Sequence, residues 1–108
     1  MNNDSFRVPV RLIPGFVFPR YAAWVPFRRL IVYNRKVTPT RRLVAHELVH
    51  VMQHERFGVS FYFRYVWGWV LSGFRYWDIP MEVEAREGEK DAFYLSWAEE
   101  LMRKNGLI

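Results

Sequence analysis

Two histidines four residues apart, with a glutamate directly after the first, are the residues best suited to do chemistry. The segment reads His46-Glu47-Leu48-Val49-His50, and the chain has three histidines in all. On a helix, residues four apart share a face, so both imidazoles can bind one metal ion. A carboxylate at position 47 can then reach a metal-bound water without becoming a ligand. The sequence therefore predicts a metal site with His46 and His50 as ligands and Glu47 as general base.

The helix that must position these residues has clear start and stop signals. Thr38-Pro39-Thr40 supplies a hydroxyl cap and a proline near the first turn, and Gly58 follows a predicted last residue near Arg56. At about 100° per residue, the apolar side chains between positions 44 and 52 fall on one side, and the polar residues of the motif fall opposite. A buried structural histidine would lie within the apolar stripe. The alternative is an ordinary amphipathic helix with two surface histidines.

The remaining pattern predicts an α+β fold. Residues 5–13 and 29–36 are predicted strands, Pro14-Gly15 is a turn signal, and 16–27 should be irregular or an edge because of its prolines. Helices are predicted over 60–76 and from about residue 79 to about residue 104. We therefore expect a single domain over 1–108, with a small antiparallel or mixed sheet in the N-terminal third followed by three α-helices.

A third metal ligand should be a carboxylate. The chain has no cysteine, which excludes thiolate ligands and disulfides. His54 lies eight residues after His46, about 12 Å along a helix axis, which is too far for both to bind one ion at about 2 Å. A catalytic zinc commonly takes three protein ligands. We therefore assign His54 at most a supporting role beside the site.

Helical phase selects among the acidic residues of the last predicted helix. If residues 81–102 form one helix, Glu84 and Asp91 lie at the edge of the buried sector, whereas Glu82 and Glu89 lie on the solvent face. A carboxylate at a buried edge needs a partner, because an unpaired buried charge is costly. We predict Glu84 as the third ligand and Asp91 as the acceptor of a ligand histidine's free ring N–H. The alternative is a solvated acidic helix start.

At this point the residues resemble a known family. The string from His46 to Gln53, followed by Glu84-Ala85 on a later helix, resembles the gluzincin type of zinc metallopeptidase. The small size and the strand before the motif helix resemble the minigluzincins in particular, which are minimal soluble scaffolds similar to the catalytic core of certain membrane metallopeptidases. The resemblance implies one zinc ion bound by His46, His50 and Glu84, with Glu47 as general base and acid.

The resemblance also implies a substrate rim. The strand containing Ile31, Tyr33 and Asn34 would form the upper rim, where an extended peptide pairs. The sequence departs from the family at Gly88, where gluzincins often carry an aspartate four residues after the ligand glutamate. The oxyanion-stabilising residue stays open among Tyr33, His54 and Arg86.

The function expected from this site is zinc-dependent hydrolysis of a peptide or protein substrate. A latent form is also expected to be feasible, with the segment around Phe16–Trp24 or the tail Leu107-Ile108 occupying the cleft. The alternative is a catalytically silent metal-binding module, or an interaction module that docks on a membrane or protein partner through its tryptophans and arginines (Trp24, Trp67, Trp69, Trp77). Core packing explains most of these aromatics more simply.

Charge and composition narrow the partners. Residues 1–77 carry 12 Lys/Arg against 3 Asp/Glu, whereas residues 78–108 carry 4 against 8. The basic residues are scattered and accompany no nucleic-acid-binding motif, so no nucleic-acid partner is expected. The N-terminus has no signal-peptide pattern, and the most apolar stretch is too short to span a bilayer. These features, with the lack of cysteine, favour a soluble cytoplasmic protein.

Overall fold

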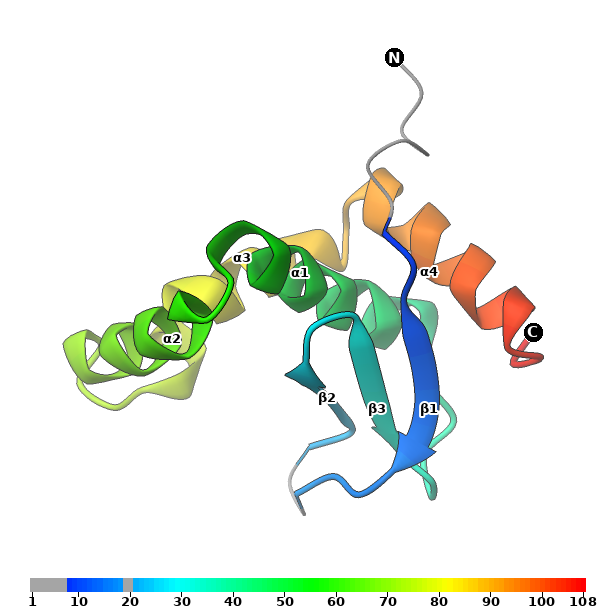
Figure 1. The fold of residues 1–108 in the computed structure, drawn as a ribbon, viewed down its shortest axis with the longest axis horizontal. Helices are drawn as coiled ribbons and strands as arrows, with labels where there is room; N and C mark the ends of the chain where they lie inside the picture. Colours follow the sequence, from blue (N-terminus) through cyan, green and yellow to red (C-terminus); the bar gives the residue numbers. More distant parts are fainter. Residues whose placement is uncertain (1–7, 19–20) are drawn as a thin grey trace.

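Three strands precede four α-helices in the described part of the chain, residues 8–18 and 21–108 of the computed structural model (Figure 1). The strands are β1 (Arg11–Gly15), β2 (Ala23–Phe27) and β3 (Leu30–Asn34). The helices are α1 (Arg41–Phe57), α2 (Ser60–Leu71), α3 (Pro80–Gly88) and α4 (Ala92–Lys104), with a short 3-10 helix at Tyr76–Asp78. The predicted α+β class, with a small mixed sheet followed by helices, is confirmed.

The sheet has the order β1-β3-β2, with β1 parallel and β2 antiparallel to β3. The strand predicted over 29–36 is the central strand β3. Part of the strand predicted over 5–13 is found as β1, and residues 5–7 of that prediction lie outside the described residues. β2 falls in the segment expected to be irregular or an edge, and its edge position tolerates Pro26, which has no N–H to donate.

Helix α1 begins and ends where its sequence signals predict. The Thr40 side chain accepts a hydrogen bond from the Leu43 N–H at 3.1 Å, and Gly58 ends the helix with a φ of 57°. One face of α1 packs with the sheet and with α4 to form the main core. Its buried residues come from the sheet (Leu12, Ala23, Val25, Ile31), from α1 (Val44, Ala45, Leu48, Val51) and from α4 (Trp97, Ala98, Leu101, Met102).

The last predicted helix is two helices, which corrects the expectation of one helix to about residue 104. The N–H groups of Glu89, Lys90 and Asp91 bond to carbonyls only three residues back, which tightens the chain into a turn. The Asp91 side chain then accepts from the Phe93 N–H at 2.8 Å and caps α4. Because α4 is a separate helix with its own N-cap, its faces are not in phase with those of α3. A helical face derived by treating residues 81–102 as one helix is therefore wrong.

The contact between α1 and α3 depends on a glycine. A Cβ at Gly88 would lie 2.2 Å from Cγ2 of Val49, a residue that is 1% exposed on α1. Real Cβ atoms do not approach another carbon that closely, so any side chain here forces α3 away from α1. Glycine at 88 therefore sets the spacing of the two helices.

A substitution at this contact should destabilise the fold. We expect Gly88→Ala to lower the free energy of unfolding by about 1–3 kcal/mol, as overpacking does in a dense core. Because Val49 is the residue it meets, the loss in Gly88→Ala/Val49→Ala should be smaller than the sum of the two single losses. Urea unfolding of all three variants measures this. Glu87→Ala, at an exposed neighbouring position, is the control, and an additive cycle would contradict the assignment.

An ion-pair clamp joins the β2–β3 turn to the last turns of α1. Glu55 receives two hydrogen bonds from Arg28, each of 3.0 Å, and two from Arg29, of 2.6 and 3.3 Å. Arg29, the second residue of this two-residue turn, takes a φ of 61°, a left-handed conformation that is uncommon for a residue other than glycine. The hydrogen bonds from both guanidinium groups lower the pKa of Glu55 from 4.5 to about 2.

This clamp predicts a specific pH dependence of stability. The pKa of Glu55 is lower in the folded protein than in the unfolded chain. The ionised carboxylate therefore stabilises the fold above the unfolded-state pKa of 4.5, and this stabilisation is lost as the pH falls toward 2. Wild type should therefore unfold at higher urea concentration than Glu55→Gln at pH 7, and this difference should shrink between about pH 5 and pH 3. A difference that stays constant over this range would contradict the role of the clamp.

Candidate metal centre

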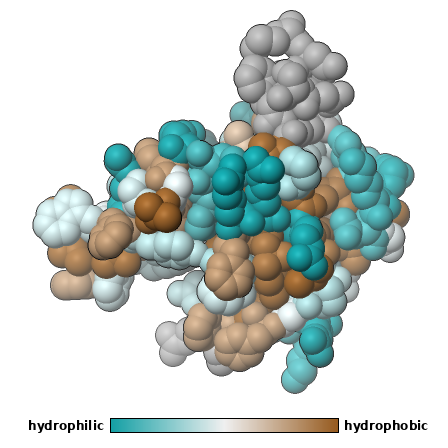
Figure 2. Space-filling view, viewed as in Figure 1, coloured by the Kyte–Doolittle hydropathy of each residue, from teal (hydrophilic) through white to brown (hydrophobic). Residues whose placement is uncertain are grey.

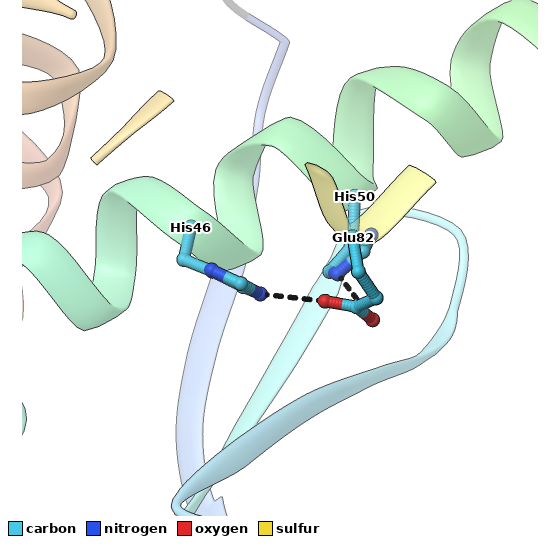
Figure 3. A group of neighbouring side chains, drawn as sticks. All are labelled: His46, His50 and Glu82. Atoms are coloured by element: carbon cyan, nitrogen blue, oxygen red, sulfur yellow. Dashed lines mark hydrogen bonds and ion pairs between the residues drawn. The ribbon is translucent and has the colours of Figure 1, made fainter. Parts of the chain in front are cut away.

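Three side chains from two helices converge on one point (Figure 3). Helix α1 supplies His46 and His50, which are four residues apart and so project from the same face. Helix α3 supplies Glu82, near its N-terminus and opposite the two imidazoles. Among the described residues, this is the one group of three whose histidine and carboxylate ligand atoms all lie within 4.8 Å of one another.

The spacing of the donor atoms suits a metal ion. Nε2 of His46 lies 3.0 Å from one carboxylate oxygen of Glu82, and Nε2 of His50 lies 3.2 Å from the other. Ligand atoms held tetrahedrally at 2.0–2.2 Å from one ion are separated by roughly 3.3 Å. The three side chains are therefore already near the separation that coordination requires, and they are close enough to hold a metal ion.

The other nitrogen of each imidazole has its own partner. Nδ1 of His46 lies 2.8 Å from a carboxylate oxygen of Glu89, and Nδ1 of His50 lies 2.8 Å from the amide oxygen of Gln53. An acceptor at Nδ1 fixes the ring orientation and leaves Nε2 as the ligand atom. Both rings thus present Nε2 to the same point.

Gln53 is itself held in place. Its amide N–H groups donate to the Met81 carbonyl at 3.0 Å and to the Glu84 carboxylate at 2.8 Å. With 1% of its surface exposed, Gln53 joins the motif helix to the start of α3 through buried hydrogen bonds. The relative positions of His50 and Glu82 therefore depend on this amide.

Electrostatics bind the cluster together. Burial by itself lowers the pKa of His46, but the hydrogen bonds with Glu82 and Glu89 and the negative charge of Glu47 outweigh it and raise the pKa to about 9. Burial likewise opposes ionisation of Glu82, yet the bonds with His46 and His50 hold its pKa well below the usual range. The cluster therefore combines imidazolium with carboxylate, and a metal cation would replace the histidine protons.

Glu47 lies beside this group but is not a member of it. Its side chain is 4% exposed and contributes to the wall of the adjoining pocket. Burial raises its pKa, although the nearby His50 and His46 act in the opposite direction. A carboxyl group with a raised pKa exchanges a proton more readily at neutral pH, which suits a general base and acid.

The carboxylate that lies close enough to both imidazoles to share a metal ion is Glu82, and not Glu84, the predicted third ligand. The Glu84 side chain is 46% exposed, bonds to Gln53 and lies 3.7 Å from Arg56, away from the imidazole Nε2 atoms. The phase estimate failed because it combined residues 81, 85 and 88 with residues 92, 95 and 102, which belong to α4. In α3 alone, the buried residues are Met81, Glu82, Ala85 and Gly88, and these place Glu82 on the inner face.

Two supporting residues are corrected as well. Asp91, predicted to accept a ligand histidine's N–H, instead caps α4, and Glu89 accepts from His46. Glu89 lies seven residues after Glu82, so choosing Glu82 would also have indicated Glu89. His54 does not contact the cluster through a hydrogen bond; its ring stacks on Phe61 at 3.8 Å between centroids, and burial lowers its pKa.

A pocket of about 430 Å³ adjoins the cluster. His46, Glu47, His50 and Glu82 form its polar end. The remaining walls are mostly aromatic and apolar. They come from the segment before β2 (Phe18, Tyr21), from β2 (Ala23, Trp24, Val25), from α2 (Phe61, Tyr62, Tyr65, Val66, Trp69) and from the 3-10 helix and the residue that follows it (Tyr76, Ile79). This pocket has the apolar lining and few polar groups typical of ligand sites.

The predicted substrate rim, with Ile31, Tyr33 and Asn34, does not line this pocket. These residues belong to β3, which is paired on both edges, and Ile31 is 1% exposed. A strand with two neighbours has no edge at which a further strand can pair. The strand beside the pocket is β2, which is an edge of the sheet.

The open candidates for an oxyanion-stabilising residue also lie elsewhere. Tyr33, His54 and Arg86 are absent from the pocket lining, and Arg86 packs over the Trp77 ring at 4.5 Å. Two other tyrosines line the pocket. Tyr65 donates its hydroxyl to Glu82 at 2.7 Å, and Tyr76 also interacts with Glu82. Burial and the charge of Glu82 raise the pKa of both tyrosines, so both keep a hydroxyl proton to donate.

The segments proposed to block the cleft occupy different positions. Phe18, Tyr21 and Trp24, from the segment Phe16–Trp24, line the pocket, and residues 19–20 of that segment lie outside the described residues. Leu107 packs against the main core and Ile108 is 55% exposed, so the C-terminal tail does not enter the pocket. Of the two predicted blocking segments, only the first lies beside the cluster.

Comparisons with known protein families, with curated proteins and with solved structures find no match.

Proposed function

We propose that this chain is a zinc-dependent peptidase whose ion is held by His46, His50 and Glu82. The proposal rests on the convergence of two imidazole Nε2 atoms and a buried carboxylate at one end of an apolar pocket. Glu47 lies beside these three side chains without belonging to their group. Nitrogen and oxygen donors in this number are typical of catalytic zinc, which keeps a further position open. A bound zinc ion would polarise a carbonyl and acidify a water toward a pKa of ~7.

Glu47 would move the proton in this reaction. Its buried carboxylate takes a proton from the attacking water and gives it to the departing amine, which its raised pKa favours. Tyr65 and Tyr76 interact with Glu82 from the pocket wall and would help to orient this ligand carboxylate. Glu89 and Gln53 keep the imidazoles oriented during the reaction.

The pocket favours an extended peptide with bulky apolar side chains. β2 forms the sheet edge beside the metal cluster, and an added peptide strand pairs at such an edge. Aromatic side chains of α2 face β2 across the pocket and would contact the peptide's side chains. Phe18 and Tyr21 narrow the same pocket. The peptidase would therefore be latent until the segment around Phe16–Trp24 moves.

The choice between two glutamates two residues apart gives a direct test of the ligand set. Glu82→Gln and His46→Ala should each weaken zinc affinity at least a hundredfold, because each removes a ligand. In known sites, mutation of a residue that only hydrogen-bonds to a ligand already weakens metal affinity by about 10–100-fold. Glu84→Gln, which alters an exposed carboxylate of the same helix, should stay within about threefold of wild type. Competition of the purified protein with a chromophoric chelator measures all of these affinities. If Glu84→Gln loses zinc and Glu82→Gln keeps it, the ligand assignment is wrong.

The role of Glu47 is tested separately from binding. We expect Glu47→Gln to keep zinc affinity close to that of wild type and to lower cleavage of a fluorogenic casein by about a thousandfold or more, because proton transfer is lost. The exposed Glu87→Gln is the matched control and should cleave as wild type does. Zinc binding without cleavage, both by wild type and by Phe18→Ala/Tyr21→Ala, which widens the pocket while keeping β1, would favour the catalytically silent metal-binding alternative and reject the peptidase.

A further inference from the structure

Helix α2 carries an apolar stripe on its outer face. Phe63, Trp67, Val70 and Leu71 are 79%, 62%, 38% and 69% exposed, and their spacing of three, four and seven residues places them on one side of the helix. Figure 2 shows hydrophobic surface on the arm at the left of the molecule, where α2 lies in Figure 1. An apolar stripe of this kind normally faces a core, so its exposure here indicates an interaction.

The inner face of α2, opposite the apolar stripe, is well packed, so the stripe is not exposed because α2 is detached from the body. The opposite face of α2 packs on the body through Phe61, which is 6% exposed, and through Gly68, where a Cβ would lie 3.0 Å from Pro80. Ile79 and Met81 complete this second core cluster. The helix therefore has a seated inner face and a separate, unpartnered outer face.

Charge indicates the chemistry of what covers the stripe. From Arg56 to Trp77 the sequence contains three arginines and no aspartate or glutamate. Arg64 extends from α2 beside the stripe, and its guanidinium lies over the Phe57 ring at 4.4 Å. Arg75, next to the exposed Phe74, is 75% exposed but pairs with Asp78 at 3.2 Å, so Arg64 is the arginine that brings positive charge to the stripe itself. Tryptophan, phenylalanine and leucine with flanking arginine is the composition of helices that lie in an anionic membrane interface.

The dimensions exclude a spanning helix. With 12 residues, α2 is about 18 Å long, shorter than the roughly 30 Å hydrocarbon core of a bilayer. Throughout the described chain no helix has the length and apolar character needed to cross a membrane. A helix of this length with one apolar face is suited to lie along the surface.

We propose that the outer face of α2, formed by Phe63, Trp67, Val70 and Leu71, docks on the surface of an anionic lipid bilayer. A second copy of the chain fits this face less well, because it would bring the Arg64 guanidinium groups of two chains to one contact, whereas an anionic bilayer offers them phosphate groups. Val66 and Trp69 line the pocket from the adjoining side of α2, so docking places the pocket beside the membrane. The proposal stands without the proposed hydrolysis, since none of its residues belongs to the metal cluster.

Vesicle binding tests the proposal directly. The full chain is mixed with sedimentable vesicles of phosphatidylcholine containing phosphatidylglycerol, or of phosphatidylcholine alone, and the bound fraction is measured. Wild type should bind the anionic vesicles at least tenfold more tightly than the neutral ones. Trp67→Ser/Leu71→Ser should bind them at least tenfold more weakly than wild type. Ile108→Ser, at a residue 55% exposed near the end of α4, should bind as wild type does.

Charge and depth provide independent readouts. Arg64→Glu should weaken binding to the anionic vesicles severalfold more than Arg42→Glu, which makes the same charge change at an exposed position on the first turn of α1. With brominated lipid chains, the fluorescence of Trp67 should be quenched and that of the core residue Trp97 should not, measured in variants that retain a single tryptophan. Circular dichroism verifies that each variant is folded.

Three results would overturn the proposal. The first is equal binding of wild type and Trp67→Ser/Leu71→Ser to the anionic vesicles, and the second is no binding by wild type. The third is a dimer in sedimentation equilibrium that Trp67→Ser/Leu71→Ser converts to monomer while vesicle binding is absent, which would assign the stripe to a second copy.

Discussion

The close approach of α3 to α1 is the constraint on which the rest of the structure depends. Glycine at 88 lets the end of α3 lie against Val49, and the buried amide of Gln53 joins α1 to the beginning of α3. These two contacts lie near the two ends of the nine-residue helix α3, so they fix both the distance of α3 from α1 and the direction of its axis. Glu82 lies between them and is therefore carried into contact with His46 and His50. Because a buried carboxylate is costly without partners, the same contact is also needed for stability.

How much of this could be predicted from sequence depends on how local each signal is. The motif helix was predictable to within a residue or two, since its cap at Thr40 and its stop at Gly58 act on adjacent backbone. The α+β class followed from the order of the elements. Helical phase could not identify the third member of the metal group. Which of Glu82 and Glu84 faces the core is clear only when α3 is considered alone, and the sequence does not show that α3 ends before the turn at residues 89–91. Acidic residues on both sides of a short helix leave the choice to tertiary packing.

The sheet shows the same limit in another form. β3 has the most regular strand sequence, and it forms the buried centre of the sheet instead of its rim. β2, which contains Pro26 and has a register shift against β3, is the strand left at the edge beside the pocket. Edge strands tolerate irregular sequences, so the strand closest to the metal cluster has the weakest strand signal in the chain. Strand order, which decides this, is not encoded in any single segment.

The position of Glu89 links the metal centre to the C-terminal helix. Glu89 accepts from His46 while its backbone forms the first residue of the turn that leads into α4, and α4 supplies Trp97, Leu101 and Met102 to the main core. Any cation that binds the folded cluster better than the unfolded chain therefore adds to the stability of both halves of the molecule, by an amount that grows logarithmically with its concentration above the dissociation constant. By reciprocity, loosening of α4 would reduce the affinity for the cation. Binding of a cation at this cluster would thus couple its occupancy to the folding of this small chain, and the supply of that ion would help to decide how long the protein survives heating or proteolysis.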